Sequence, residues 1–318
     1  MTTLYLDRRD LAVELASGRL RVRHPDGRVQ DVPLALLERV VITATTRLDS
    51  SLLARLGAAG VAVMILNPRS ADRVAFLLGA PHNDLGVRLG QYRLLDHPEW
   101  VGTWSQRLVR AKLVGQRRLL RNAMALRPEA RLPLHKGIQA LDAALAHCAQ
   151  TAAPATLRGI EGAAAAAYFG ALAAVLPAAL DFGGRNRRPP RDPVNALLSL
   201  TYTLLHFDAV RAAYAVGLDP YLGFYHRPAF SRESLASDLL EILRPSADRF
   251  VWRLLAEATL RADHFSRQGD ACLLGKAGRG HFYAAYEPFA AQPRRLLRRL
   301  CRMLARKMRE SAPDLADD

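Results

Sequence analysis

Short runs of apolar and polar residues in alternation fill the first part of the chain. LYLDRRDLAVEL, RLRVRH and VVITAT have the period of strands, and the turn signals SG, PDG and VP lie between such runs. Asp26-Gly27 separates RLRVRH from RVQDVPL and predicts a hairpin. SSLLARLGAAG (50–60) predicts a short helix closed by Gly57 or Gly60, and VAVMILN (61–67) a buried strand. We therefore expect a small β-rich domain with a structural or dimerising role.

After residue 86 the apolar residues recur at three- and four-residue spacings, and this helical period continues to the end of the chain. Such spacing gives each segment one apolar face, which is typical of packed α-helices. Prolines and glycines are expected to separate the helices at positions 154, 177, 217, 245 and 293. The predicted fold class is α+β, with a small β-rich N-terminal domain (1–86) and a larger all-α C-terminal domain (87–318).

The charge of the chain is strongly positive and unevenly distributed. Its 318 residues include 45 Lys and Arg against 30 Asp and Glu, a formal net charge of +15. Most of the excess lies after residue 86. A positive excess confined to one region favours a polyanionic partner such as DNA. An arginine-rich surface that is merely solvated is the alternative.

Cysteine usage and hydropathy indicate a cytoplasmic protein. The chain has three cysteines and lacks a C-x-x-C spacing, which favours a reducing compartment and argues against a zinc–thiolate site. The N-terminus lacks the charged-then-apolar order of a signal peptide. The most apolar stretch begins directly after Glu161, consists mainly of alanine and is interrupted by Pro177, so we expect no membrane-spanning segment.

Two acids stand close together in the segment GFYHRPAFSRESLASDLLEILRP (223–245). Ser231 as N-cap and Pro245 as the stop predict a helix between them. Asp238 and Glu241, three residues apart, would lie side by side at the edge of its apolar stripe. Carboxylates this close repel each other unless a cation or a proton lies between them. A solvated helix edge would show the same pattern.

Glu161 is an isolated acid in a long alanine-rich stretch. At 3.6 residues per turn it shares a helix face with apolar residues, so burial would leave its carboxylate in need of a partner. An ion pair with an arginine of another helix is one interpretation. The other is a metal ion held by Glu161, His226 and Glu241, with Asp238 close by.

Such a ligand set, mostly oxygen donors with one imidazole, suits Mg²⁺ or Mn²⁺ better than a structural zinc. A divalent ion in a strongly basic domain indicates phosphodiester chemistry, because the metal polarises the phosphate while arginines hold the flanking backbone. One rival hypothesis is a non-catalytic, basic helical DNA-binding protein whose acids pair with arginines. Another is a metal-dependent hydrolase of small phosphoesters, which would not need so much positive charge.

Three stretches carry a resemblance to a known family. They are LRGIEGAAAAAYFGAL around Glu161, DPVNALLSLTYTLL (192–205) and GLDPYLGFYHRPAFSRESLASDLLEILRP (217–245). In this order they resemble the CRISPR-associated endonuclease/integrase family of spacer acquisition. The N-terminal stretches VPLALLERVVI and SSLLARLGAAGVAVMIL agree in outline. The likeness covers essentially the whole chain.

The resemblance implies an N-terminal β-domain and a helical domain whose site binds Mg²⁺ or Mn²⁺. The implied catalytic residues are Glu161, His226, Asp238 and Glu241, and the implied metal ligands are Glu161, His226 and Glu241. It also implies a homodimer that works on double-stranded DNA with a small ferredoxin-like companion subunit. A 3′-hydroxyl of the incoming DNA would attack a phosphodiester of the CRISPR repeat, which is a transesterification. Family members have Asp or Glu as the last acid, so Glu241 is compatible with metal binding.

Basic residues near these acids are candidate DNA contacts. Arg244 lies one helical turn beyond Glu241, in reach of a phosphate near the metal, although a helix C-terminus also favours arginine by itself. The loop GGRNRRPPRD (183–192) supplies Arg185, Arg187 and Arg188, and a solvated loop is equally consistent. QRLVRAKLVGQRRLLR and RRLLRRLCRMLARKMRE predict basic amphipathic helices, which suit a duplex backbone but also resemble membrane-surface helices.

Overall fold

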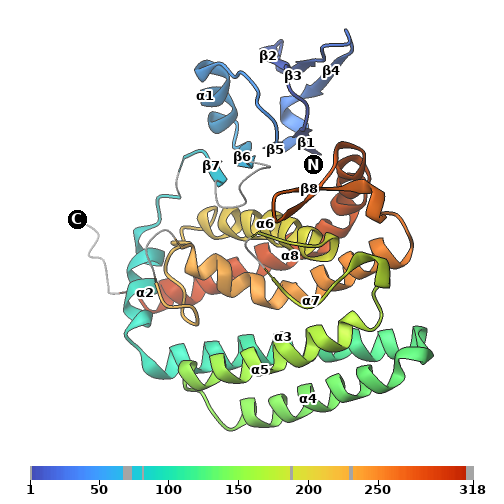
Figure 1. The fold of residues 1–318 in the computed structure, drawn as a ribbon. Coiled ribbons are helices and arrows are strands. Elements are labelled where there is room, and N and C mark those ends of the chain that lie inside the picture. The colour runs from blue at the N-terminus through green and yellow to red at the C-terminus, as the bar shows by residue number, and fades with distance from the viewer. Residues whose placement is uncertain (1, 67–73, 81, 187–188, 229–231, 313–318) are drawn as a thin grey trace. The chain divides into compact units, whose positions relative to one another are not determined.

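The chain folds into two compact units. The computed structural model describes residues 2–66, 74–80, 82–186, 189–228 and 232–312. The units are Met1–Asn83 and Asp84–Asp318, with their boundary close to the one expected at residue 86. Strands dominate the first unit and helices the second (Figure 1). The α+β class predicted from the periodicity is confirmed.

Two small sheets, one α-helix and a short 3-10 helix (Leu34–Leu36) form the regular structure in the described part of the first unit. The strands of the larger sheet, in spatial order, are β1 (Thr2–Leu6), β5 (Leu37–Ile42), β6 (Ala62–Leu66) and β7 (Val74–Leu77). β1, β5 and β6 are parallel, and β7 is antiparallel to β6. The antiparallel second sheet contains β2 (Ala12–Ala16), β3 (Arg19–Arg23) and β4 (Val29–Pro33). The helix α1 (Ser50–Ala58) connects β5 to β6, because parallel neighbours need a crossover.

The predicted hairpin turn and the glycine that closes α1 are confirmed, whereas Val32-Pro33 lies at the end of strand β4. Gly27 has φ +84 in the turn between β3 and β4, and Gly60 has φ +69 just after α1, a conformation that favours glycine. The side chain of Asp49 accepts the N–H of Ser51 and caps the start of α1. Leucines and valines of both sheets and of α1 form one continuous apolar core.

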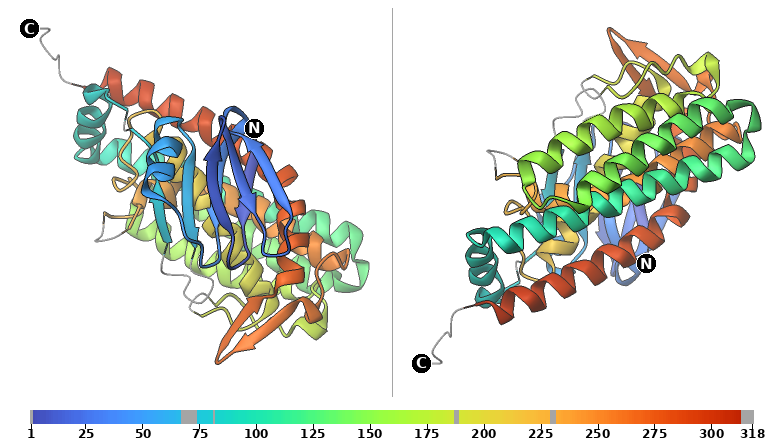
Figure 2. Two further views of the ribbon diagram at one scale, coloured as in Figure 1. Left: turned by 90° about the horizontal axis from the view of Figure 1, so that it is seen from above. Right: turned by 90° about the horizontal axis from the view of Figure 1, so that it is seen from below.

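Long helices make up most of the second unit. They are α2 (Leu85–Leu95), α3 (Pro98–Leu126), α4 (Arg131–Ala149), α5 (Pro154–Ala173), α6 (Pro193–Tyr214), α7 (Ser234–Ala256) and α8 (Lys276–Glu310). α3, α4 and α5 pack on one another, and Figure 2 shows them side by side in green. α6 packs against α7 and α8, and α3 packs against α7, which joins the two groups. No described helix is long and apolar enough to cross a membrane.

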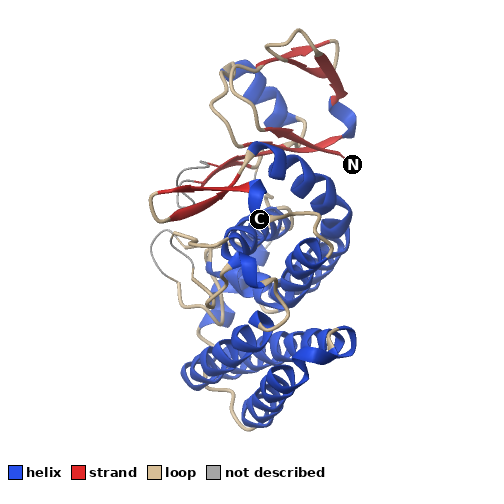
Figure 3. Ribbon diagram, turned by 45° about the vertical axis from the view of Figure 1, so that its right-hand side comes forward, coloured by secondary structure: helices blue, strands red, loops and turns tan. Residues whose placement is uncertain are grey.

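A short hairpin interrupts the helical unit, which the periodicity of the sequence predicted to be purely α-helical. β8 (Phe265–Gln268) and β9 (Ala271–Leu274) pair antiparallel around Gly269, whose φ is +57 (Figure 3). Strands of four residues are too short to show an alternating pattern that stands out from the helical period around them. The hairpin is therefore an addition to the predicted domain.

Two of the expected helix breaks are wrong. Pro245 lies inside α7 and Pro293 inside α8, so neither proline ends a helix. The predicted N-cap Ser231 lies outside the described residues, and α7 begins at Ser234. Packing explains why Pro245 is tolerated, because its ring fills the space beside Gly115 of α3. A Cβ atom on Gly115 would lie 2.8 Å from Cγ of Pro245, so only glycine allows the two helices to approach so closely.

Candidate active site

Asp238 organises the loop that precedes α7. Its carboxylate is fully buried and accepts the backbone N–H groups of Phe224 and Tyr225 on Oδ2, at 2.8 and 2.9 Å. Its Oδ1 accepts the backbone N–H of His226 at 2.9 Å and lies 2.7 Å from Nδ1 of the same residue. Four donors already share the two oxygens. Asp238 therefore supports the site through the loop and the imidazole.

The position of Asp238 determines how His226 faces the site. A carboxylate only accepts, so the imidazole donates from Nδ1 and is left with Nε2 as its acceptor atom. Nε2 lies 4.0 Å from Oε1 of Glu241, one turn further along α7. A histidine held by a carboxylate on one nitrogen and open on the other has the form that metal-binding histidines take.

Glu241 is a buried carboxylate surrounded by cations. It is 3% exposed, whereas the sequence placed it at the edge of the apolar stripe. Its Oε2 accepts from Nζ of Lys112 at 2.6 Å, and its Oε1 accepts from Nε of Arg244 at 2.8 Å. Burial by itself raises the pKa of Glu241, but the charges of Arg244 and Lys112 and the hydrogen bond from Lys112 outweigh burial and lower this pKa to about 2. Glu241 is therefore ionised at neutral pH.

Glu161 reaches the same place from α5. Its Oε1 accepts a hydrogen bond from Nζ of Lys112, and its Oε2 accepts one from the hydroxyl of Tyr225 at 2.5 Å. Burial and the neighbouring Glu161 carboxylate raise the pKa of Tyr225, so its hydroxyl stays protonated and donates. The sequence left open an ion pair between Glu161 and an arginine, but the cation at Glu161 is Lys112.

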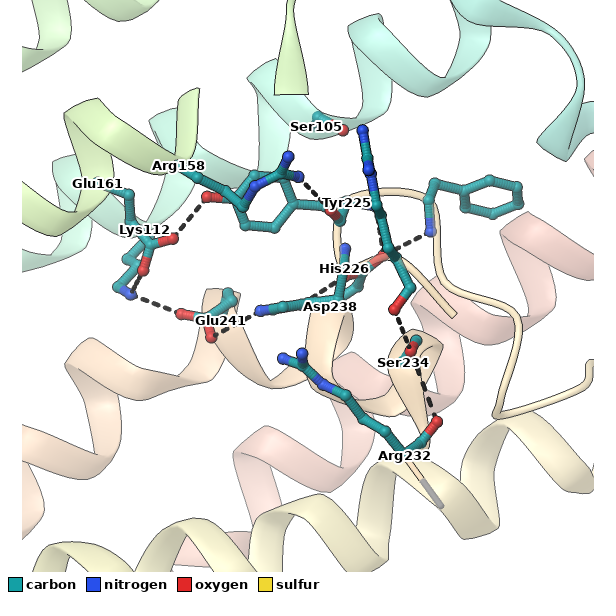
Figure 4. Close-up of polar contacts among 12 residues, drawn as sticks. Ser105, Lys112, Arg158, Glu161, Tyr225, His226, Arg232, Ser234, Asp238 and Glu241 are labelled. Atoms are coloured by element: carbon teal, nitrogen blue, oxygen red, sulfur yellow. Dashed lines mark hydrogen bonds and ion pairs between the residues drawn. The ribbon is translucent and has the colours of Figure 1, made fainter. Parts of the chain in front are cut away.

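Lys112 was not among the residues singled out from the sequence. Figure 4 shows its ammonium between the carboxylates of Glu161 and Glu241. In the sequence, nothing obvious distinguishes Lys112 from the many other cations of this basic helix. Its spacing nevertheless contains a signal, because it falls on the buried stripe of α3 that includes Leu108, Val109, Leu113 and Gln116. A lysine on an apolar face requires a buried anion.

The three acids and the imidazole singled out from the sequence do meet, although they come from α5, α7 and the loop between α6 and α7. Among the described residues, no three His, Cys, Asp or Glu side chains stand close enough as placed to ligate one ion. The ammonium of Lys112 lies where a shared cation would lie between Glu161 and Glu241. Two carboxylates and one supported imidazole suit Mg²⁺ or Mn²⁺. The donor set therefore fits such an ion once Lys112 has moved.

The candidate DNA-binding arginines differ in their surroundings. Arg244 is paired with Glu241, and its guanidinium lies 4.5 Å from the centre of the Tyr202 ring. Arg185 donates to Oδ1 of Asn195 at 2.8 Å and to Oγ of Ser199 at 3.1 Å. Arg187 and Arg188 lie outside the described residues.

Behind Arg244 lies a buried acid that no sequence pattern indicated. Asp248, on α7, accepts hydrogen bonds from the hydroxyls of Tyr168 on α5, at 2.9 Å, and of Tyr202 on α6. Burial raises the pKa of Asp248 to about 6, even though both hydroxyls and the charge of Arg244 act in the opposite direction. This network joins three helices directly behind the site. Asp248 is 80 positions from Tyr168 and 46 from Tyr202, so no local spacing could reveal the network.

The protein has a β-rich unit followed by a cationic helical unit. In the helical unit, two glutamates and a histidine converge. This combination of fold and site defines the class of the protein. The family described as CRISPR associated protein Cas1 matches residues 4–288. The chain belongs to this family, as the resemblance in the sequence implied.

Individual relatives and structures agree with this assignment. The chain is 34% identical over 313 residues to a "CRISPR-associated endonuclease Cas1 1" of Thermodesulfovibrio yellowstonii, covering 98% of each chain. The fold resembles a structure titled "Casposase bound to integration product", with a TM-score of 0.81, 20% identity, and coverage of 100% of this chain and 96% of that one. A third similarity is to a chain of a "Cas6-RT-Cas1--Cas2 complex", with a TM-score of 0.80, 23% identity, and coverage of 98% and 35%.

Proposed function

We propose that this chain is a metal-dependent DNA endonuclease/integrase that inserts short DNA fragments, or spacers, into a CRISPR repeat array. The observation that carries the proposal is the convergence of Glu161 and Glu241 on one cation position inside the basic helical unit, with Nε2 of His226 4.0 Å from Oε1 of Glu241. Family membership supports it. So do the names of the two matches, an endonuclease and a casposase bound to an integration product.

Each residue of the site has a separate role in the proposed enzyme. Glu161, His226 and Glu241 would hold Mg²⁺ or Mn²⁺, while Asp238 keeps the imidazole oriented. The bound ion supplies polarisation of a phosphoryl oxygen and a lowered pKa for the attacking hydroxyl. Arg244 balances the buried charge of Glu241, and the exposed cations of the helical unit bind the DNA backbone.

The proposed reaction exchanges one phosphodiester bond for another. The 3′-hydroxyl oxygen of the incoming DNA forms a bond to a phosphorus atom of the repeat. The bond between that phosphorus and the 3′-oxygen of the repeat breaks, and the leaving oxygen takes up a proton while the attacking hydroxyl loses one. Attack by water in place of the hydroxyl would give endonuclease cleavage at the same site.

The proposed assembly is a homodimer on double-stranded DNA with a small ferredoxin-like companion subunit. Support comes from the similarity to a chain in a complex whose title includes Cas2. The positive excess of the helical unit supports the DNA partner, because neutralised phosphates release counterions and so favour binding.

Strand transfer by Glu161→Gln, His226→Asn and Glu241→Gln variants tests the proposal. Each variant should lose at least about a hundredfold in rate, because a ligand matters more than the supporting residues whose loss costs about 10–100-fold. DNA affinity should be retained, since many phosphate contacts supply it. The control is Glu257→Gln, which changes an acid at the exposed end of α7. Full activity of Glu161→Gln, or of the wild type in EDTA, would refute the assignment.

A further inference from the structure

The ammonium of Lys112 compensates the negative charges of the site without a metal ion. Lys112 is 5% exposed, and its Nζ contacts Oε1 of Glu161 and lies 2.6 Å from Oε2 of Glu241. Two carboxylates this close would repel each other strongly in a buried place if nothing lay between them. One ammonium compensates both at once, with Arg244 on the far side of Glu241 and His226 beside it.

The packing of α3 on α7 determines the position of the Lys112 ammonium. α3 packs against α7, and Gly115 faces Pro245 in this contact. Lys112 stands three residues before Gly115, and Glu241 stands four residues before Pro245, so both lie about one turn from the contact on the side of Glu161. The position of Lys112 therefore follows from the packing of α3 on α7, and a flexible surface lysine would not be held in this way.

We propose that Lys112 is a positioning residue of the metal centre, which holds Glu161 and Glu241 in the absence of a divalent ion and is exchanged for that ion on binding. The inference rests on the metal centre of the proposed function. The oxygens that accept from Nζ are the ones a shared ion would need at its short ligand distance of about 2.0–2.1 Å. Two cations cannot occupy that place together, because like charges at this distance repel. Metal binding therefore includes the departure of the ammonium.

Manganese titration of the full chain tests the exchange. Free Mn²⁺ is followed by its electron paramagnetic resonance signal in the wild type and in Lys112→Met, Lys112→Arg and Lys136→Met. Lys112→Met should bind Mn²⁺ at least about tenfold more tightly than the wild type, because no ammonium has to be displaced. Lys112→Arg, which keeps the charge, should not gain this tightening. Lys136 is an exposed lysine of α4, so its variant should match the wild type.

A loss of structure in Lys112→Met would also weaken binding, so a second measurement uses the unmodified protein. Acetylation by an N-hydroxysuccinimide ester, followed by mass spectrometry, reports the accessibility of each lysine. Lys112 should react several-fold faster in saturating Mn²⁺ than in EDTA, whereas Lys136 should react at one rate. Equal Lys112 rates in the two conditions would overturn the exchange.

Mn²⁺ titration of a Glu161→Gln variant distinguishes the proposed metal centre from the proposed exchange of Lys112. If wild-type Mn²⁺ binding does not depend on Glu161, the metal centre itself is refuted and the exchange falls with it. If binding depends on Glu161 but Lys112 is acetylated at equal rates in Mn²⁺ and in EDTA, the exchange alone is refuted. Binding that depends on Glu161, together with an exposed Lys112, supports both.

Discussion

Asp238 contacts His226 twice through one carboxylate oxygen. This oxygen accepts the backbone N–H of His226 and also lies 2.7 Å from Nδ1 of the His226 ring. The same side chain thus fixes both the backbone and the ring of the histidine. Asp238 also accepts two further backbone N–H groups, which leaves it no role as an open metal ligand. The sequence counted it among the catalytic acids, and its position makes it their support.

Replacing Asp238 should therefore change both folding and metal binding. Asp238→Ala leaves buried N–H groups without their acceptor, at a cost of about 1–3 kcal/mol for each unsatisfied group. Mn²⁺ affinity should fall by about 10–100-fold, because the imidazole loses its orientation. Urea unfolding and Mn²⁺ titration measure the two effects. Unchanged Mn²⁺ affinity in a folded variant would show that the pair does not orient the site.

Tyr225→Phe should slow strand transfer without weakening DNA binding. The variant removes the hydroxyl that donates to Oε2 of Glu161 and leaves the buried ring in place. A hydrogen bond to a charged group contributes about 1.5–3 kcal/mol, so a rate loss of about tenfold or more is expected if that bond orients the carboxylate. Tyr221→Phe is the matched control, since this tyrosine of the same loop is 49% exposed. Equal rates for the two variants would contradict the role of Tyr225.

DNA binding should weaken steeply with salt and show little sequence preference for isolated duplexes. With roughly six to ten neutralised phosphates, affinity would fall by roughly 10³–10⁵ between about 50 and 200 mM salt. Replacing the exposed Arg295, Arg299 and Arg302 of α8 by alanine should lower the slope of log K against log salt by up to about 0.9 for each phosphate that the variant no longer neutralises. Fluorescence anisotropy across a salt series measures this slope. An unchanged slope would exclude this face of α8 from the interface.

Asp248 should make stability depend on pH. Burial raises the pKa of Asp248 from 3.8 to about 6. The folded protein therefore holds this proton more tightly than the unfolded chain does, so the stabilisation is complete below about pH 4 and is lost as the pH rises through about 6. Asp248→Asn stays neutral at both pH values. The free energy of unfolding of this variant minus that of the wild type should therefore increase by on the order of 2–3 kcal/mol from about pH 4 to pH 7. Urea unfolding at both pH values measures the difference, and a constant difference would refute the raised pKa.

The sequence by itself determined the features that depend on local pattern. Alternation and helical spacing predicted the two-part organisation, because side-chain periodicity follows directly from strand and helix geometry. Asp26-Gly27 predicted the hairpin between β3 and β4. The scarcity of acids in an apolar or basic context pointed to Glu161, Asp238 and Glu241, because an ionised group on an apolar face needs a partner, and His226 stood near them in the sequence.

Only the tertiary structure decided what those residues contact. Lys112 and Glu241 are 129 positions apart, and they meet because Gly115 lets α3 approach α7 at Pro245. The same approach of the two helices explains why Pro245 lies inside a helix although local rules predicted an end there. Asp238 and Glu241 look equivalent in sequence, yet one faces the backbone of the loop and the other faces the cations. Local spacing determines which helix face a side chain occupies, whereas its partner depends on the neighbouring helix that packs against that face.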